Sequence, residues 1–173
     1  MMEQQIIISG TGGQGVLFLT RLLAEVAMHE GLDVLTAETH GMAMRGGTVI
    51  SHVKVGSFQS PVIRRGKADG GLFLTESNLD VHGDFIKPGG QLFVNTGKTG
   101  DYLNIDATDL AVECGSQLVA NLVLIGYAIQ HESLFCGSDV MEETIKKVSL
   151  PRHLDINLRG FKRGLIFSKG GQV

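Results

Sequence analysis

The start of the chain joins an apolar strand to a glycine-rich loop and an amphipathic helix. Residues 6–8 are three isoleucines, which is typical of a strand buried on both faces. The loop, residues 10–15 (GTGGQG), follows directly, and apolar residues then recur at helical spacing over residues 16–30. Residues 32–37 predict a second strand. A strand–helix–strand unit of this kind restricts the chain to an α/β fold with a Rossmann-like start.

The connection to the third predicted strand departs from that start. Residues 48–55 alternate as a strand does, and only residues 39–47 separate them from the second strand. A parallel crossover needs a dozen residues or more, so we expect an antiparallel pairing. Further core strands are predicted at residues 71–75, 91–95 and 103–105. The sheet should therefore be mixed, mostly parallel, with one antiparallel strand.

The remaining segments predict helices, and a few residues indicate where they begin or end. Glycine lowers helix propensity, so Gly160 and Gly164 weaken the last helix. We expect Ser138 or Asp139 to cap the helix before it, and Pro88-Gly89-Gly90 to end the first. The predicted helices are residues 78–86, 109–113, 117–130, 138–148 and 153–168. Together these elements predict one three-layer α/β domain spanning residues 1–173.

Composition excludes several classes of protein. With 43% apolar residues and a formal net charge of −3, the chain is not disordered. Fifteen basic residues against 18 acidic ones argue against nucleic-acid binding. Arg21 and Glu25 interrupt the first apolar stretch, so we expect no signal peptide, no membrane span and a cytoplasmic location. Glycine is unusually frequent: the chain has 24 among 173 residues, which is about twice the usual share of ~7%.

The glycine loop admits two interpretations. Gly10, Gly12 and Gly15 satisfy G-x-G-x-x-G, and Glu38 lies 23 residues beyond, where an acid could hold a ribose. A P-loop is excluded because Val16 occupies the lysine position. The alternative is a tight turn packed against a neighbouring subunit. The missing helix after the second strand favours this alternative over a dinucleotide site.

A second loop, residues 40–47 (HGMAMRGG), should lie at the same sheet edge as the first. Arg45 offers a planar fork of donors for a carboxylate, a phosphate or an acidic group of a partner. Its plain alternative is a solvated arginine in a turn.

Residues for metal or redox chemistry are few. Iron–sulfur clusters generally need four thiolates, and the chain has only Cys114 and Cys136. Its six histidines lack zinc-ligand spacing, and no carboxylates pair as acid and base. We therefore assign no metal ligands and no catalytic residues.

Two motifs carry a family resemblance that spans nearly the whole chain. GGQGV at residues 12–16 and RGGT at residues 45–48 resemble the gamma subunit, or gamma-like domain, of 2-oxoacid:ferredoxin oxidoreductases. The form HGMAxRGG at residues 40–47 is most similar to the beta subunit of indolepyruvate oxidoreductases. The likeness continues at residues 60–61, 66–69, 88–90, 121–126 and 155–161.

The resemblance implies a subunit of an enzyme that oxidatively decarboxylates a 2-oxoacid with coenzyme A and reduces ferredoxin. Alpha, beta and, where present, delta subunits would be its partners, holding thiamine diphosphate and iron–sulfur clusters. This chain would assemble the complex and help bind coenzyme A, would be inactive alone, and could then form a homodimer. The implied binding residues are Gly12, Gly13, Gln14, Gly15, Arg45, Gly46 and Gly47. Asn121 and Asn157 match recurrent asparagines without an assigned role.

A stand-alone NAD- or FAD-binding Rossmann-type oxidoreductase is the competing hypothesis. It rests on the G-x-G-x-x-G fingerprint together with Glu38. Titration of the purified chain with NADH or FAD separates the two hypotheses, because the dinucleotide hypothesis is rejected if neither binds below millimolar concentration.

Overall fold

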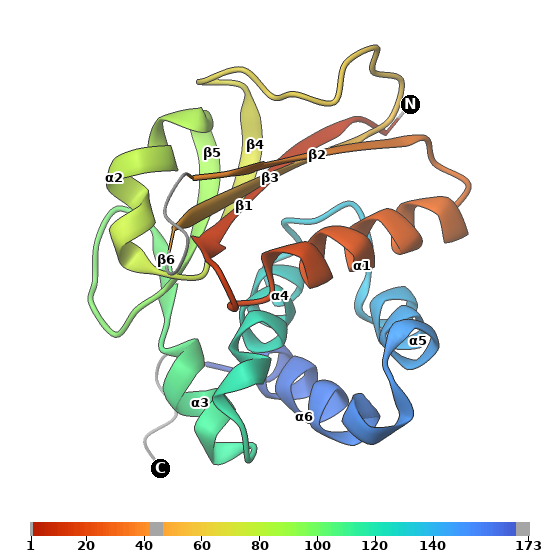
Figure 1. The fold of residues 1–173 in the computed structure, drawn as a ribbon, viewed down its shortest axis with the longest axis vertical. Helices are drawn as coiled ribbons and strands as arrows, with labels where there is room; N and C mark the ends of the chain where they lie inside the picture. Colours follow the sequence, from red (N-terminus) through yellow and green to blue (C-terminus); the bar gives the residue numbers. More distant parts are fainter. Residues whose placement is uncertain (1, 42–46, 169–173) are drawn as a thin grey trace.

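A six-stranded sheet in the order β2-β3-β1-β4-β5-β6 forms the centre of the computed structural model, which describes residues 2–41 and 47–168 (Figure 1). The strands are β1 Gln4–Thr11, β2 Val34–His40, β3 Thr48–Val55, β4 Ala68–Phe73, β5 Ile86–Asn95 and β6 Leu103–Ile105. Only β3 runs antiparallel to its neighbours, pairing with β1 and β2. The other pairs, β1 with β4, β4 with β5 and β5 with β6, are parallel. The predicted mixed sheet with one antiparallel strand is confirmed.

The two faces of the sheet carry unequal layers. The helices are α1 Val16–His29, α2 Leu79–His82, α3 Ala107–Glu113, α4 Ala120–Gln130, α5 Ser138–Val148 and α6 Leu154–Leu165. All except α2 lie on one face (Figure 1) and form the larger core with Ile6 and Ile8 of β1. The opposite face, with Ile7, is covered by a thin layer around Ile63 and Phe85. The central isoleucines are thus buried on both faces, as predicted.

The helical layer depends on a close contact between α4 and α6. A Cβ atom on Gly126 would overlap the Phe161 carbonyl oxygen, and one on Gly164 would overlap the Val123 carbonyl oxygen. One on Gly160 would lie 2.8 Å from Val119 Cγ2. The glycines that weaken the predicted last helix are therefore what lets it pack. Here tertiary packing outweighs the low helix propensity of glycine.

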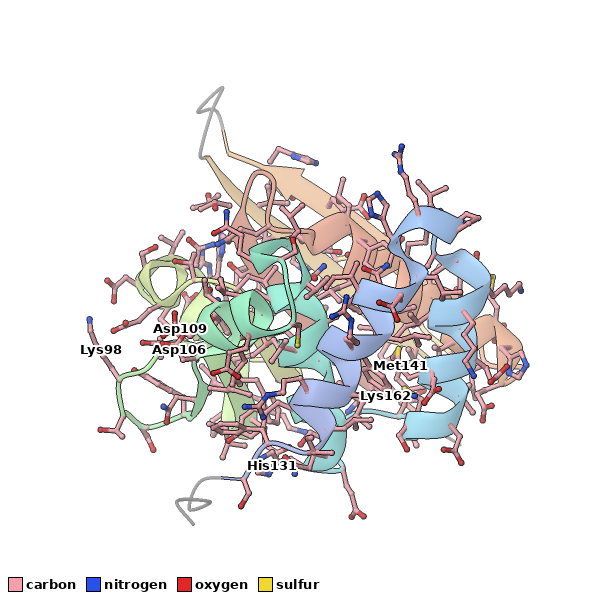
Figure 2. All side chains as sticks on the ribbon, turned by 90° about the horizontal axis from the view of Figure 1, so that it is seen from below. Lys98, Asp106, Asp109, His131, Met141 and Lys162 are labelled. Carbon is pink, nitrogen blue, oxygen red and sulfur yellow. The ribbon has the colours of Figure 1, made fainter. Side chains whose placement is uncertain are left out.

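Helix α5 packs beside α6 on the outer side of this layer. Figure 2 shows Met141 and Lys162 where the two helices meet. Met141 is fully buried in the larger core, and Lys162 Nζ lies 3.1 Å from Glu142 Oε1. Within the described residues, none of the helices is both long and apolar enough to span a membrane.

Two predicted helix ends were wrong. Gly137, without a side-chain hydrogen bond, is the N-cap of α5, because Ser138 and Asp139 already lie inside the helix. Residues 88–90 do not end a helix but lie within β5. There Gly89 has φ +79° and the β4–β5 register shifts between Ala68 and Gly70. The Pro-Gly-Gly sequence thus forms an irregularity in the strand.

Candidate functional site

The glycine loop leaves the end of β1 and turns sharply into α1. Gly13 and Gly15 have φ of +89° and +82°, which only glycine adopts without strain, and Gly15 is the N-cap of α1. Gln14 braces the turn from inside: its Oε1 accepts a 2.8 Å bond from Thr11 N, and its Nε2 donates to Leu74 O at 3.3 Å. Gln14 therefore holds the loop to the end of β4.

The loop is closed on one side and open on the other. A Cβ on Gly15 would overlap Asn121 Nδ2 of α4, which itself donates to Gly15 O at 3.4 Å. Cβ atoms on Gly12 and Gly13 would meet nothing within 4 Å. Two adjacent glycines thus present bare backbone to space that the described residues leave empty.

A cleft of about 310 Å³ opens at this point. It lies at the carboxyl ends of β1, β4 and β5, the edge where open α/β sheets bind ligands. Its lining is neutral and rich in carboxamides. The lining residues are Gly12, Gly13, Gln14, Leu74, Asn95, Thr108, Gln117, Leu118, Ala120 and Asn121. The amide of Asn95 is fixed by bonds to Leu74 O (3.1 Å) and to Thr108 Oγ1 (2.9 Å).

A second cavity of about 490 Å³ adjoins the first. The two share Gly13, Leu118 and Asn121, so these residues form the ridge between them. Leu118 is 72% exposed on that ridge. The other lining residues are Gly15, Phe18, Arg21, Ser116, Val119, Leu122, Val148, Ser149, Leu150, His153, Ile156 and Asn157. We call the two cavities together the glycine-loop cleft.

The charge of the glycine-loop cleft favours anionic or neutral polar ligands. Among the described residues that line it, Arg21 and His153 are the ionisable side chains, and both are basic types. Helix α1 begins at the cleft with no acid in its first turn, so its N-terminal dipole is uncompensated. The second cavity adds apolar walls. The cleft can therefore take a ligand with phosphate, amide and alkyl parts.

The second predicted loop meets the first through the backbone. Gly12 N donates to Gly47 O at 3.2 Å, so the two loops are joined at the same sheet edge, as expected. The structure brings together Gly12, Gly13, Gln14, Gly15 and Gly47 of the predicted binding residues. Arg45 and Gly46 lie outside the described residues.

Glu38 lies far from the glycine loop. It sits on β2 and pairs with Ser51 of β3, which in turn pairs with Ile8 of β1. Since adjacent strands are ~4.8 Å apart, the acid is two strands, roughly 10 Å, from the loop strand. The inserted β3 removes the ribose contact on which the dinucleotide hypothesis rests.

Sequence reasoning missed most of the cleft. Asn95, Thr108 and Gln117 come from three separate elements, and no local pattern marks them. Asn121 and Asn157 were noticed only through the family resemblance. One signal was available for Asn121, which is a buried polar residue in a helix start that is otherwise strongly apolar.

The two cysteines, Cys114 and Cys136, are free thiols outside the cleft. Burial raises the pKa of Cys136 to about 12, so its thiolate form is disfavoured. Among the described residues, no three His, Cys, Asp or Glu side chains gather as metal ligands would.

The fold defines a mixed α/β protein with a cleft at the carboxyl ends of β1, β4 and β5. The chain belongs to the pyruvate ferredoxin/flavodoxin oxidoreductase family, whose model matches residues 5–166. The family expected from the two motifs is thereby confirmed.

Named relatives are similar over most of their length. The chain is 32% identical over 189 residues to the indolepyruvate oxidoreductase subunit IorB of Archaeoglobus fulgidus, covering 94% of each chain. It is 26% identical to the 2-oxoglutarate synthase subunit KorC of Methanothermobacter marburgensis, covering 99% of this chain and 100% of the relative.

Solved structures share the fold. Pyruvate oxidoreductase subunit PORC of Thermotoga maritima matches with a TM-score of 0.78 at 23% identity, covering 95% of this chain and 96% of that one. A TM-score of 0.78 is also found for the 2-oxoglutarate:ferredoxin oxidoreductase from Magnetococcus marinus, whose structure has 2-oxoglutarate, coenzyme A and succinyl-CoA bound. Its identity is 20%, over 95% of this chain and 31% of that chain.

Proposed function

We propose that this chain is a gamma-type subunit of a 2-oxoacid:ferredoxin oxidoreductase. The complex decarboxylates a 2-oxoacid of pyruvate, 2-oxoglutarate, branched-chain or indolepyruvate type to an acyl-CoA, and electrons pass to ferredoxin. The observation that carries the proposal is the backbone junction of Gly12 and Gly47 above the glycine-loop cleft. The whole chain, residues 1–173, acts as one gamma-type domain.

The glycine-loop cleft suits part of coenzyme A. The carboxamides of Gln14, Gln117 and Asn121 can exchange hydrogen bonds with amide groups of a pantetheine arm. Arg21 lies where a phosphate would find a cationic partner, and His153 lines the same cavity. When bound, coenzyme A supplies the thiol that accepts the acyl group.

This chain's own residues would bind and orient, and they move no electrons. The bare backbone at Gly12 and Gly13 lets a ligand or a partner chain approach to van der Waals distance. Exposed Leu118 on the ridge, and Leu150 beside the second cavity, are apolar surface that a partner subunit would bury. Assembly and coenzyme A binding thus use neighbouring surfaces.

The remaining cofactors belong to companions. Two free thiols do not provide the four ligands of an iron–sulfur cluster, so the alpha, beta or delta subunits hold the clusters and thiamine diphosphate. Ferredoxin is reached through the complex. Without these cofactors the isolated chain is inactive, and it can self-associate through the same apolar surface. Its proposed location is the cytoplasm.

Co-expression with the companion subunits tests the proposal. We expect the tagged chain to recover its companions, and the complex to show oxoacid-dependent viologen reduction that needs this chain. The isolated chain should show none. Full activity of the companions without this chain, or turnover by this chain alone, contradicts the proposal.

An arginine comparison separates binding from assembly. Arg45→Ala removes a charge-assisted bond of ~1.5–3 kcal/mol, so the coenzyme A KM should rise roughly 10- to 100-fold while decarboxylation persists. Arg159→Ala is the matched control, because Arg159 pairs with Asp155 on α6 outside the cleft lining. If decarboxylation and coenzyme A use fall equally, Arg45 serves assembly instead.

A further inference from the structure

A buried hydrogen-bonded chain lies beneath the glycine loop, on the face of the sheet opposite the large helical layer. It joins Ser9 at the end of β1, Asn78 of the turn η1 (Glu76–Asn78) and His82 of α2. These side chains are 0%, 2% and 8% exposed. None of them lines the glycine-loop cleft.

Asn78 connects this chain to the glycine loop. Its Nδ2 donates both to Gly10 O at 2.7 Å and to Ser9 Oγ at 2.9 Å. Gly10 is the first glycine of the loop, so Asn78 fixes the backbone at the point where the loop leaves β1. Both bonds are buried, so the loss of either leaves a polar group without water.

One assignment of the Ser9 hydroxyl proton gives every group of this chain a partner, and it makes His82 neutral. Ser9 Oγ accepts from Asn78, and it lies 2.7 Å from His82 Nδ1. Among the hydrogen bonds of the described residues, this nitrogen is the only acceptor for the Ser9 hydroxyl proton. A nitrogen that accepts carries no proton, so the ring is in its neutral form.

We propose that His82, Ser9 and Asn78 form a relay that positions the glycine loop, and that the relay holds only while His82 is neutral. Protonated at Nδ1, His82 would become a donor, and the Ser9 oxygen would face two donors with its own proton unpaired. Because the Ser9 oxygen can accept from both donors, the cost lies in the buried hydroxyl proton that has lost its acceptor. Relieving that cost shifts Ser9 and, with it, the Asn78 amide that bonds both Ser9 Oγ and Gly10 O. The three are positioning residues, and the effect on ligand binding rests on the proposed function of the cleft.

The surroundings of His82 oppose its protonation. Burial and Arg65, on the segment that covers this face, lower its pKa, while Asp84 raises it by a smaller amount. Buried His52 of β3 faces the same space across Phe85, whose ring centroid lies 5.5 Å from that of His52 and 6.1 Å from that of His82. Loss of the relay is therefore expected at a pH below the ordinary pKa of histidine.

His52 supplies the matched control. Its Nδ1 accepts from Ile63 N at 3.3 Å, so it too is held neutral by a donor that cannot reverse. Its ring bonds the segment that covers this face, and within the part of the chain that the structure describes it makes no hydrogen bond to the glycine loop. Both histidines are buried beside Phe85, but His82 bonds Ser9 below the glycine loop whereas His52 bonds the Ile63 backbone.

Nuclear magnetic resonance of the full-length chain tests the relay without any ligand. We expect the amide signals of Thr11, Gly12 and Gly13 to shift between pH 7.5 and 5 with the midpoint of the His82 ring nitrogens. In His52→Gln this coupling should persist. In Asn78→Ala, His82 should still titrate while the loop signals no longer follow it.

The Asn78 variant distinguishes a bonded relay from a field effect. If Asn78→Ala leaves the coupling intact, or if wild-type loop signals ignore His82, the relay is wrong. Should Asn78→Ala fail to fold, His82→Gln decides the matter: its side-chain oxygen can accept from Ser9, so the loop should stay in its neutral-pH state throughout. A loop that still titrates in His82→Gln overturns the proposal.

The assembled complex provides the functional readout. From pH 7.5 to 5.5 the coenzyme A KM should rise about fivefold in the wild type, which is ~1 kcal/mol at 25 °C, and remain flat in His82→Gln. The ratio of kcat between the two should not change. If the resonance coupling is present but KM stays flat in both, the relay stands and the coenzyme A role of the loop is wrong.

Discussion

The glycine loop after β1 and the α4–α6 contact both depend on glycine, for opposite reasons. At Gly126 and Gly164 a Cβ atom would overlap the backbone of the facing helix. At Gly12 and Gly13 it would meet nothing. The first pair makes room for another helix of the same chain, and the second borders open space. Counting glycines in the sequence cannot separate the two uses, because the difference lies in what faces each residue.

The largest effect on stability should come from the helix contact. Gly164→Ala raises helix propensity yet forces α4 and α6 apart, so we expect a loss of about 3 kcal/mol in the free energy of unfolding. Urea denaturation measures it. Gly137→Ala is the control, since its Cβ would meet nothing within 4 Å and its φ is −86°. Equal urea midpoints for the two variants would show that the helices are not in close contact.

Gly15 combines both situations, because it belongs to the glycine loop and is also in close contact with Asn121 of α4. Gly15→Ala places a Cβ at φ +82° and against Asn121, so we expect it to destabilise by roughly 1–3 kcal/mol. The strain at positive φ and the contact can be separated. Adding Asn121→Ala should recover the contact part and leave ~1 kcal/mol. A double variant no more stable than Gly15→Ala means that Asn121 does not press on the loop.

The thin layer around Ile63 and Phe85 contains two buried histidines, which should make the stability of the fold depend on pH. The pKa values of His52 and His82 are lowered, mainly by burial, so below pH ~6.5 the unfolded chain binds protons that the folded chain does not. The free energy of unfolding therefore falls as the pH drops from 7.5 to 5.5. The His52→Gln/His82→Gln double variant should be flatter over this window. A wild type with the same urea midpoint at both pH values contradicts this.

Gly12 should show the smallest change in stability. Its Cβ would be unobstructed and its φ is not positive, so Gly12→Ala should alter the free energy of unfolding by less than about 0.5 kcal/mol. The coenzyme A KM of the assembled complex should nonetheless rise, because the methyl group occupies the open side of the loop. An unchanged KM and unchanged recovery of companions would mean that nothing approaches Gly12.

Elements governed by local pattern were predictable from the sequence. Thr48–Val55 and Ser138–Val148 have the bounds that alternation and helical spacing predicted. The short link before β3 also predicted its antiparallel pairing. Such features depend on chain length and periodicity, which a sequence states directly.

Features that depend on distant partners were not predictable. Residues 88–90 look like a helix stop and lie instead in β5, because Ile86 before them and Gln91 after them both pair with β4. Asn95 lines the same cavity as Gln14 because the sheet order places β1, β4 and β5 side by side, and Gln117 joins them from the turn before α4. Without a structure, nothing marks these side chains as neighbours.

The antiparallel strand has one more consequence. Because β3 returns alongside β1, residues 41–47 link two strands at the rim where the first glycine loop also turns. Insertions or deletions in that link would leave both strands in register, because the pairing of β2 with β3 lies outside it. A change in the length of this link is thus compatible with an unchanged six-stranded sheet.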